Sequence, residues 1–224
     1  MSRFEREKSN GHVKLYALAE GYMLEYADGT NLKFRFKDKT RSELGIPITC
    51  RDLRSSDGSA YHPELSKIVR NPDPHKRYIE VGAGLGEFAP RIRGIVVIDP
   101  ANYLLMLEML KEIKPDVGWL DRIRLAKLVR RCEAILDPAR VTLINKTLQG
   151  AVENHPDLLE SADVVVDNNG AFEWGWIEKF RSNGWRGFEE IMAAEQRLVK
   201  ENGLLYYNQE TVYQKQEGKM VAIR

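Results

Sequence analysis

The chain has 224 residues, of which 43% are hydrophobic and 30% charged, and its formal net charge is +1. That length is sufficient for one α/β domain with a large core plus a modest extension, and the composition is that of an ordinary soluble globular protein. A net charge near zero provides no global field for nucleic acid or an acidic membrane, so such a partner would need a local patch. No apolar run approaches the roughly 18 residues of a membrane span, and the first residues contain no apolar signal region. Because there are also only two cysteines, Cys50 and Cys132, we expect a cytoplasmic protein without a disulfide framework.

Residues 1–75 are interpreted as an N-terminal appendage that could cap a substrate site. From Val13 to Tyr26 the apolar residues fit both the helical and the strand period, so both structures stay open. Asp28-Gly29, followed by alternating apolar and basic residues, predicts a turn and a strand. The polar stretch 38–62 is expected to be a long loop, and a helix is expected to begin near Pro63.

From residue 76 onward, apolar runs alternate with helical segments. Continuous apolar runs predict five buried strands, at 78–81, 95–98, 141–144, 162–167 and 204–207. A short helix containing Pro90 is expected between the first two strands. Helical periodicity predicts further helices at 102–113, 120–136, 148–154 and 187–201. The last of these is expected to stop at Asn202-Gly203, with the glycine as a left-handed cap.

This alternation predicts an α/β fold in which residues 76–224 form a Rossmann-like domain with a doubly wound, mostly parallel sheet. Ligands of such sheets bind beyond the carboxyl ends of the strands, near the switch point of the strand order. The C-terminal end is short. The segments 211–213 and 219–223, separated by Glu217-Gly218, either form a hairpin or leave the sheet truncated.

The most informative motif begins in the first apolar run, as Glu80-x-Gly82-x-Gly84-x-Gly86. Glycines without Cβ atoms allow the backbone to turn tightly and to approach a ligand closely, and a following helix N-terminus would offer unpaired N–H groups. The second run ends at Asp99, and an acid at that strand tip can accept hydrogen bonds from a ribose. These features predict a cofactor that contains adenosine.

The spacing bears on which cofactor binds. A dinucleotide fingerprint needs its third glycine at position 87, where this chain has Glu87. A carboxylate at Glu80 would also repel a pyrophosphate, whereas it suits a ligand with an ammonium and a sulfonium group. The motif with its upstream acid resembles the first motif of the class I S-adenosylmethionine-dependent methyltransferases, and Asp99 resembles the ribose-binding acid of that family.

The resemblance covers about residues 77–208 and implies S-adenosylmethionine as cofactor. It implies that the glycine turn receives the methionine end, that Glu80 helps to neutralise the ammonium, and that Asp99 binds the ribose. The implied cofactor-binding residues are Glu80, Gly82, Ala83, Gly84, Gly86, Asp99, Pro100, Thr147, Asp167 and Asn168. Two segments depart from the family pattern. Asn145-Lys-Thr147 replaces an acid near the adenine, and Asp167-Asn-Asn-Gly170 differs from the motif of enzymes that methylate amino groups of bases and glutamine.

Methyl transfer from a sulfonium needs mainly an in-line arrangement, so no catalytic side chain has to stand out. Where a base is used, Asp167 and His62 are the candidates, although Asp167 could equally contact the cofactor and His62 could be a surface or capping residue. Phe172 and Trp174 are interpreted either as an acceptor-binding wall or as core packing. Tyr103 could cover the adenine or pack within its helix.

Other patterns favour structural interpretations. Arg124, Lys127 and Arg131 recur at helical spacing, where a solvated charged face is favoured over a phosphate-binding stripe. The four histidines are scattered and the cysteines lack ligand spacing, so no metal site is expected.

The sequence therefore predicts a methyltransferase acting on an oxygen or nitrogen atom of a small-molecule acceptor, without a membrane partner. The alternatives are methylation of RNA or protein, an NAD(P)-dependent oxidoreductase, and a non-catalytic cofactor-binding assembly protein.

Overall fold

The computed structural model describes residues 63–99, 101, 103–113, 119–167, 186–207 and 211–224, together with the backbone of six strands between residues 7 and 49. Those six strands form an antiparallel sheet in chain order: β1 Glu7–Ser9, β2 Val13–Leu18, β3 Gly21–Tyr26, β4 Asn31–Arg35, β5 Lys39–Ser42 and β6 Pro47–Thr49. Residues 13–26, for which the sequence was compatible with both helix and strand, therefore form the two strands β2 and β3. The long loop predicted for 38–62 is wrong where β5 and β6 lie, because these short, polar strands carry no apolar alternation and are specified by pairing with their neighbours.

A second sheet has seven strands in the order β13-β12-β11-β10-β7-β8-β9. Its strands are β7 Tyr78–Val81, β8 Ile95–Ile98, β9 Val141–Ile144, β10 Ala162–Asp167, β11 Val199–Tyr207, β12 Thr211–Gln216 and β13 Lys219–Ala222. The strands from β7 to β11 are mutually parallel, and β12 and β13 complete the edge in antiparallel pairing. The predicted doubly wound, mostly parallel α/β sheet is confirmed, and its strand order reverses between β7 and β10.

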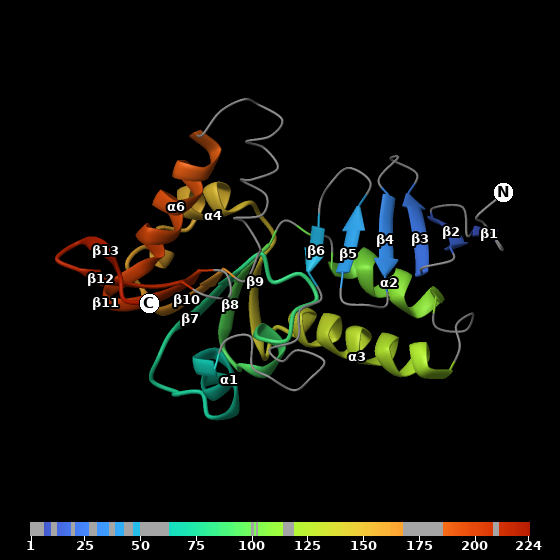
Figure 1. Cartoon of the computed structure of the whole chain (residues 1–224), viewed down its shortest axis with the longest axis horizontal. Helices are drawn as coiled ribbons and strands as arrows, with labels where there is room; N and C mark the ends of the chain where they lie inside the picture. The colour runs from blue at the N-terminus through green and yellow to red at the C-terminus, as the bar shows by residue number, and fades with distance from the viewer. Residues whose placement is uncertain are drawn as a thin grey trace.

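Helices cover both faces of this sheet (Figure 1). They are α1 Pro63–Arg70, η1 Ala89–Arg91, α2 Tyr103–Ile113, α3 Trp119–Leu136, α4 Leu148–Asn154, η3 Pro156–Leu158 and α6 Arg186–Leu198. In Figure 1, α4 and α6 lie on one side of the sheet, and α1 and α3 lie on the other. Within the described part of the chain, no helix is both long enough and apolar enough to cross a bilayer.

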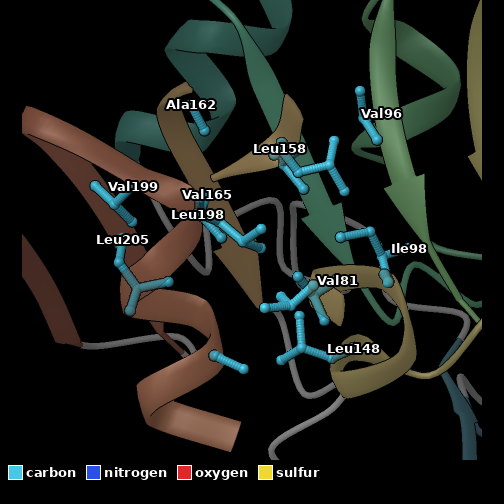
Figure 2. Close-up of a cluster of buried hydrophobic side chains, with 14 of the residues drawn as sticks. Val81, Val96, Ile98, Leu148, Leu158, Ala162, Val165, Leu198, Val199 and Leu205 are labelled. Atoms are coloured by element: carbon cyan, nitrogen blue, oxygen red, sulfur yellow. The ribbon is translucent and has the colours of Figure 1, made fainter. Parts of the chain in front are cut away.

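Two hydrophobic clusters, one on each face, explain the continuous apolar runs of the strands. Side chains alternate across a strand, so Ile79 packs in the cluster with α4 and α6 while Tyr78 packs in the cluster with α1. Figure 2 shows the first cluster, with Leu148 of α4 next to Val81 of β7. By the same alternation Asp167, which follows Val166 of the second cluster, lies on the α6 face.

Helix α1 belongs to the core of the seven-stranded sheet although it precedes residue 75. Its Leu65 and Val69 are buried in the same cluster as Tyr78, and Glu64 forms an ion pair with Arg224 over 2.6 Å. The helix joins the strands because its buried positions are spaced by four residues, which places them on one face. The boundary of the appendage at residue 75 stays a prediction.

The join between α6 and β11 differs from the sequence-based expectation. The helix ends at Leu198, and β11 starts at once with Val199. Asn202, with φ of 63°, takes the left-handed conformation that was predicted for Gly203. Gly203 is required for a different reason: a Cβ at this residue would lie 2.8 Å from the Ala162 carbonyl oxygen. This close approach coincides with a register shift between β10 and β11.

The C-terminal hairpin, one of the two arrangements left open by the sequence, is formed by β12 and β13. Its turn residues Glu217 and Gly218 have φ of 53° and 74°, as a two-residue hairpin turn requires. Both of their N–H groups donate to the Glu201 carboxylate. The sheet is therefore completed at this edge and not truncated.

Replacing Gly203 with Ala should destabilise the protein, because the new methyl group would press on a backbone carbonyl that cannot move without disturbing β10. We expect a loss of about 1–3 kcal/mol in the free energy of unfolding, measured by urea denaturation. Gly218→Asn is the matched control, since a Cβ there meets no atom within 4 Å and Asn tolerates the left-handed region. Equal stability of the two variants would contradict the close approach at Gly203.

Candidate functional site

The glycine turn Gly82–Gly86 leaves the carboxyl end of β7 at the point where the strand order reverses. Gly82 and Gly84 have φ of 62° and 53°, a region that side chains disfavour, so glycine is needed at both positions. The turn is closed by the Gly82 N–H, which donates to the Ile98 carbonyl over 2.8 Å, and by the Gly86 N–H, which donates to the Ala83 carbonyl over 2.9 Å. Its backbone is therefore held in one conformation by the chain itself.

Asp99, the acid at the tip of β8, lies directly against this turn. Its Oδ2 accepts hydrogen bonds from the Gly84 N–H and the Tyr103 hydroxyl, each over 2.8 Å. Its Oδ1 accepts one from the Ala101 N–H, also over 2.8 Å. A carboxylate has about four lone-pair sites, so one site remains, on Oδ1. Asp99 is 5% exposed, and burial raises its pKa although the three hydrogen bonds act to lower it.

Tyr103 takes the packing role of the two that the sequence left open. It is almost fully buried in α2, and its hydroxyl is committed to Asp99. Behind it, the Cys132 thiol of α3 donates to the Tyr103 carbonyl over 3.1 Å, and burial raises the pKa of that thiol to about 12. The acid is thus supported by two helices of the β8–β9 connection.

Glu80 lies on β7, just before the turn, and is 3% exposed. Its Oε2 accepts a hydrogen bond from the Ala89 N–H over 2.8 Å. Burial is the main cause that raises its pKa from 4.5 to about 8. Asp99 and Asp167 raise it further, while the Ala89 N–H and Arg131 act in the opposite direction. At neutral pH the ligand-free protein therefore holds this side chain mainly in its protonated form.

The segment after the glycine turn corrects one expectation. Only the three-residue 3-10 turn η1 follows, so the turn does not lead into an α-helix whose N-terminus could bind an anion. Pro90 within this segment has no N–H, and Gly94 ends it, which leaves too few residues for a helix. The Ala89 N–H that such a helix would have presented to a ligand is bonded to Glu80.

The solvated face expected for the basic residues of α3 is wrong for Arg131. Its side chain is buried because α3 packs against η1, and an Arg stem can lie along apolar surface while its head finds a polar partner. Its Nη1 donates to the Leu85 carbonyl over 3.1 Å, and its Nη2 lies 3.9 Å from Glu87, which also pairs with Arg91. Position 87, where a dinucleotide-binding motif needs its third glycine, is therefore occupied by the buried, ion-paired Glu87. Lys127 is exposed as expected.

The end of β9 contributes structural contacts. Thr147 is the N-cap of α4, where its Oγ1 accepts from the Gly150 N–H over 3.2 Å, and it is exposed. The Asn145 side chain donates to the carbonyls of Asp99 and Ala101 over 3.0 and 2.7 Å, which ties the end of β9 to the end of β8. The cofactor contact implied for Thr147 by the family resemblance stays a prediction.

Asp167, the last residue of β10, is 0% exposed and lies beside Tyr207 of β11 in register. Glu195 of α6 is also 0% exposed and is hydrogen-bonded to Asp167. This acid pair lies on the α6 face, whereas Glu80 and Asp99 contact the turn on the other face. The remaining predicted site residues lie outside the described part of the chain: His62, Pro100, Asn168, Phe172 and Trp174.

The described residues contain no group of three or more His, Cys, Asp or Glu side chains that could hold a metal ion. In comparisons with known proteins, no family model matches the chain and no curated protein matches it significantly. The functional argument therefore depends on the fold and on the geometry of this site.

Sequence reasoning named Asn145 only as part of the segment that replaces the acid near the adenine, did not single out Glu195, and gave Arg131 a surface role. Asn145 had a weak signal, because a polar residue directly after an apolar run belongs to the ligand-binding edge of a parallel sheet. Glu195 also had one: it is spaced by four residues from Ile191, on the buried stripe of its helix.

The raised pKa of Glu80 makes stability depend on pH. Its folded-state pKa lies above 4.5, so its contribution is fully present below about pH 4.5 and is lost as the pH rises through about 8. The loss reaches up to about 5 kcal/mol, at about 1.4 kcal/mol per pKa unit. Glu80→Gln, which keeps an acceptor for the Ala89 N–H, should remove this part of the pH dependence. Urea denaturation at about pH 5 and about pH 9 measures it, and a variant with the wild-type dependence would contradict the assignment.

Proposed function

We propose that the chain is an S-adenosylmethionine-dependent methyltransferase that transfers a methyl group in line to an oxygen or nitrogen atom of a small-molecule acceptor. The observation that carries the proposal is the concentration of buried carboxyl groups at the switch point between β7 and β10. Asp99 and Asp167 both raise the pKa of Glu80 there, so the edge has an excess of negative charge. A ligand with an ammonium and a sulfonium group would compensate that excess, whereas a pyrophosphate would increase it.

In this proposal the turn Gly82–Gly86 receives the methionine end of the cofactor, and Glu80 loses its proton to face the ammonium. Asp99 and Pro100 border the ribose, and Thr147 borders the adenine. A ribose diol needs two acceptor sites. One hydroxyl would use the remaining site on Oδ1 of Asp99, and the other would replace the Tyr103 hydroxyl on Oδ2.

The bound cofactor supplies an activated methyl group, and the chain's own residues supply position. The rigid turn fixes the donor, and proximity and orientation account for most of the acceleration in such a displacement. Asp167 and Asn168 would border the transferred methyl group. Asp167 would accept the proton when the acceptor is a hydroxyl or a protonated amine, and the product carries the methyl group in its place.

Calorimetry tests the proposal with S-adenosylhomocysteine, NADH and NADPH as probes. We expect binding of S-adenosylhomocysteine alone, with release of up to one proton near pH 7, because its ammonium lowers the pKa of Glu80 from about 8. Titrations in two buffers of different ionisation enthalpy count that proton, and Glu80→Gln should bind without releasing it. Binding of a nicotinamide nucleotide alone would refute the methyltransferase proposal.

The role of Asp99 can be tested separately. Asp99→Ala should weaken S-adenosylhomocysteine binding by about 1–3 kcal/mol, because it removes the acceptor for the ribose hydroxyls. Tyr103→Phe, which frees an acceptor site on Oδ2, should bind at least as tightly as the wild type.

Asp157→Asn is the control for the loss of an acid. Asp157 is exposed, and within the described part of the chain its one ion pair is with Arg77. Unfolding curves of all three variants establish that each is folded at the assay temperature. Wild-type affinity in folded Asp99→Ala would remove Asp99 from the site.

A further inference from the structure

Two acids that come from distant parts of the chain meet inside the seven-stranded sheet domain. Asp167 ends β10, and Glu195 lies in the third turn of α6, the helix that packs on β10 and β11. Both side chains are 0% exposed, and a hydrogen bond joins them. Around them lie apolar residues of the cluster shared by α4, α6 and the sheet, such as Ile191 and Leu198. Water therefore does not separate the two charges.

The hydrogen bond between the two acids requires a proton. Neither oxygen of Glu195 accepts a hydrogen bond from an N–H or O–H group of the described residues. Two ionised carboxylates are both acceptors only, and in a buried site their mutual repulsion is large. A proton on one of them converts the contact from repulsion to a carboxyl–carboxylate hydrogen bond, which is among the shorter and stronger kinds.

We propose that Asp167 and Glu195 hold one proton between them, and that Glu195 is the positioning residue that presents Asp167 to the ligand site as a single, fixed negative charge. The shared proton rests on the full burial of both carboxyl groups and on the contact between them, whereas the presentation to a ligand rests on the proposed function. The pair is useful for that function. When Glu195 is neutral, Asp167 is held in one orientation and is a better hydrogen-bond acceptor than it would be beside a second ionised carboxylate.

The surrounding charged groups favour retention of the proton. Burial, followed by the charge of Asp167 and the hydrogen bond to it, raises the pKa of Glu195 well above its ordinary value. From β11, Tyr207 contributes only a neutral phenol, because burial and the two acids raise its pKa. Glu80 of β7 also interacts with Asp167 and, as an acid, supplies no positive charge. Among the described residues, no charge of opposite sign contributes to the pKa shift of Glu195.

The other charged side chains that the structure describes on α4, α6 and β11 are paired elsewhere or exposed. Lys200 of β11 pairs with Asp163 at the opposite end of β10. Arg197 and Glu190 of α6, Glu153 of α4 and Glu201 of β11 are exposed. None of the cations that the structure describes on these elements therefore neutralises the pair, whereas a shared proton does.

The proton can be counted in the ligand-free protein from the pH dependence of unfolding. A carboxyl group that is protonated in the folded state and ionised in the unfolded state makes the unfolding constant rise about tenfold per pH unit. Glu80 contributes one such proton, so Glu80→Gln serves as the parent. Introducing Glu195→Gln into that parent should make the unfolding constant rise with pH about tenfold less per pH unit, between about pH 6 and about pH 7.5. The reason is that Gln donates the hydrogen bond without a titratable proton. Glu190→Gln on the same helix is the matched control and should lower nothing.

Two further measurements decide between a proton and mere packing. Infrared spectra of the parent at neutral pH should contain the C=O stretch of a protonated carboxyl group, which Glu195→Gln removes and Glu190→Gln retains. Glu195→Leu, of similar volume, should lose stability relative to Glu195→Gln, since the leucine side chain cannot donate a hydrogen bond to Asp167. An unchanged pH dependence and an unchanged carboxyl band in Glu195→Gln would overturn the proposal. If Glu195→Gln does not fold, the band in the parent decides alone, since a parent without it lacks the proton. A failure to bind S-adenosylhomocysteine leaves these results intact and counts against the proposed function only.

Discussion

Strands β7 and β10 lie side by side although two strands and three connections separate them in the chain, and this adjacency determines the chemistry of the molecule. Because all strands from β7 to β11 run in parallel, their polar last residues meet at one edge. Glu80, one residue before the end of β7, and Asp99 approach that edge on one face of the sheet, and Asp167 approaches it on the α6 face. Their charges interact there because burial removes the water that would otherwise screen them. The strand order therefore brings three acids close together before any ligand is present.

The turn beside this edge is stabilised by side chains and not by a helix. Asp99 binds its middle through Gly84, Glu80 binds the Ala89 N–H just after it, and Arg131 binds the Leu85 carbonyl. Two of these three contacts use the acids that the proposed function assigns to the cofactor. Binding therefore has to exchange internal hydrogen bonds for contacts with the ligand, and the affinity will depend on the difference between the two sets.

Much of the sheet could be predicted from the sequence, because a strand that is buried on both faces consists of consecutive apolar residues, as in Ile95–Ile98. The join of α6 and β11 could not, since the pattern around Asn202 is shared between a helix cap and a bulged strand. The glycines and Asp99 were found through their local motif. Glu195 was not, because its significance depends on a partner 28 positions earlier, Asp167, which only the folded chain brings into contact.

The arrangement behind Asp99 has a consequence for oxidation and labelling chemistry. The Cys132 thiol is hydrogen-bonded to the carbonyl of Tyr103, whose hydroxyl donates to Asp99. The Cys132 side chain is fully buried. With a pKa of about 12 the thiolate, which is the reactive species, is almost absent at physiological pH. Alkylating reagents and peroxide can thus modify this sulfur only when α2 and α3 move apart. The rate of its modification would report how often the support of the acid opens, with no cofactor or substrate required.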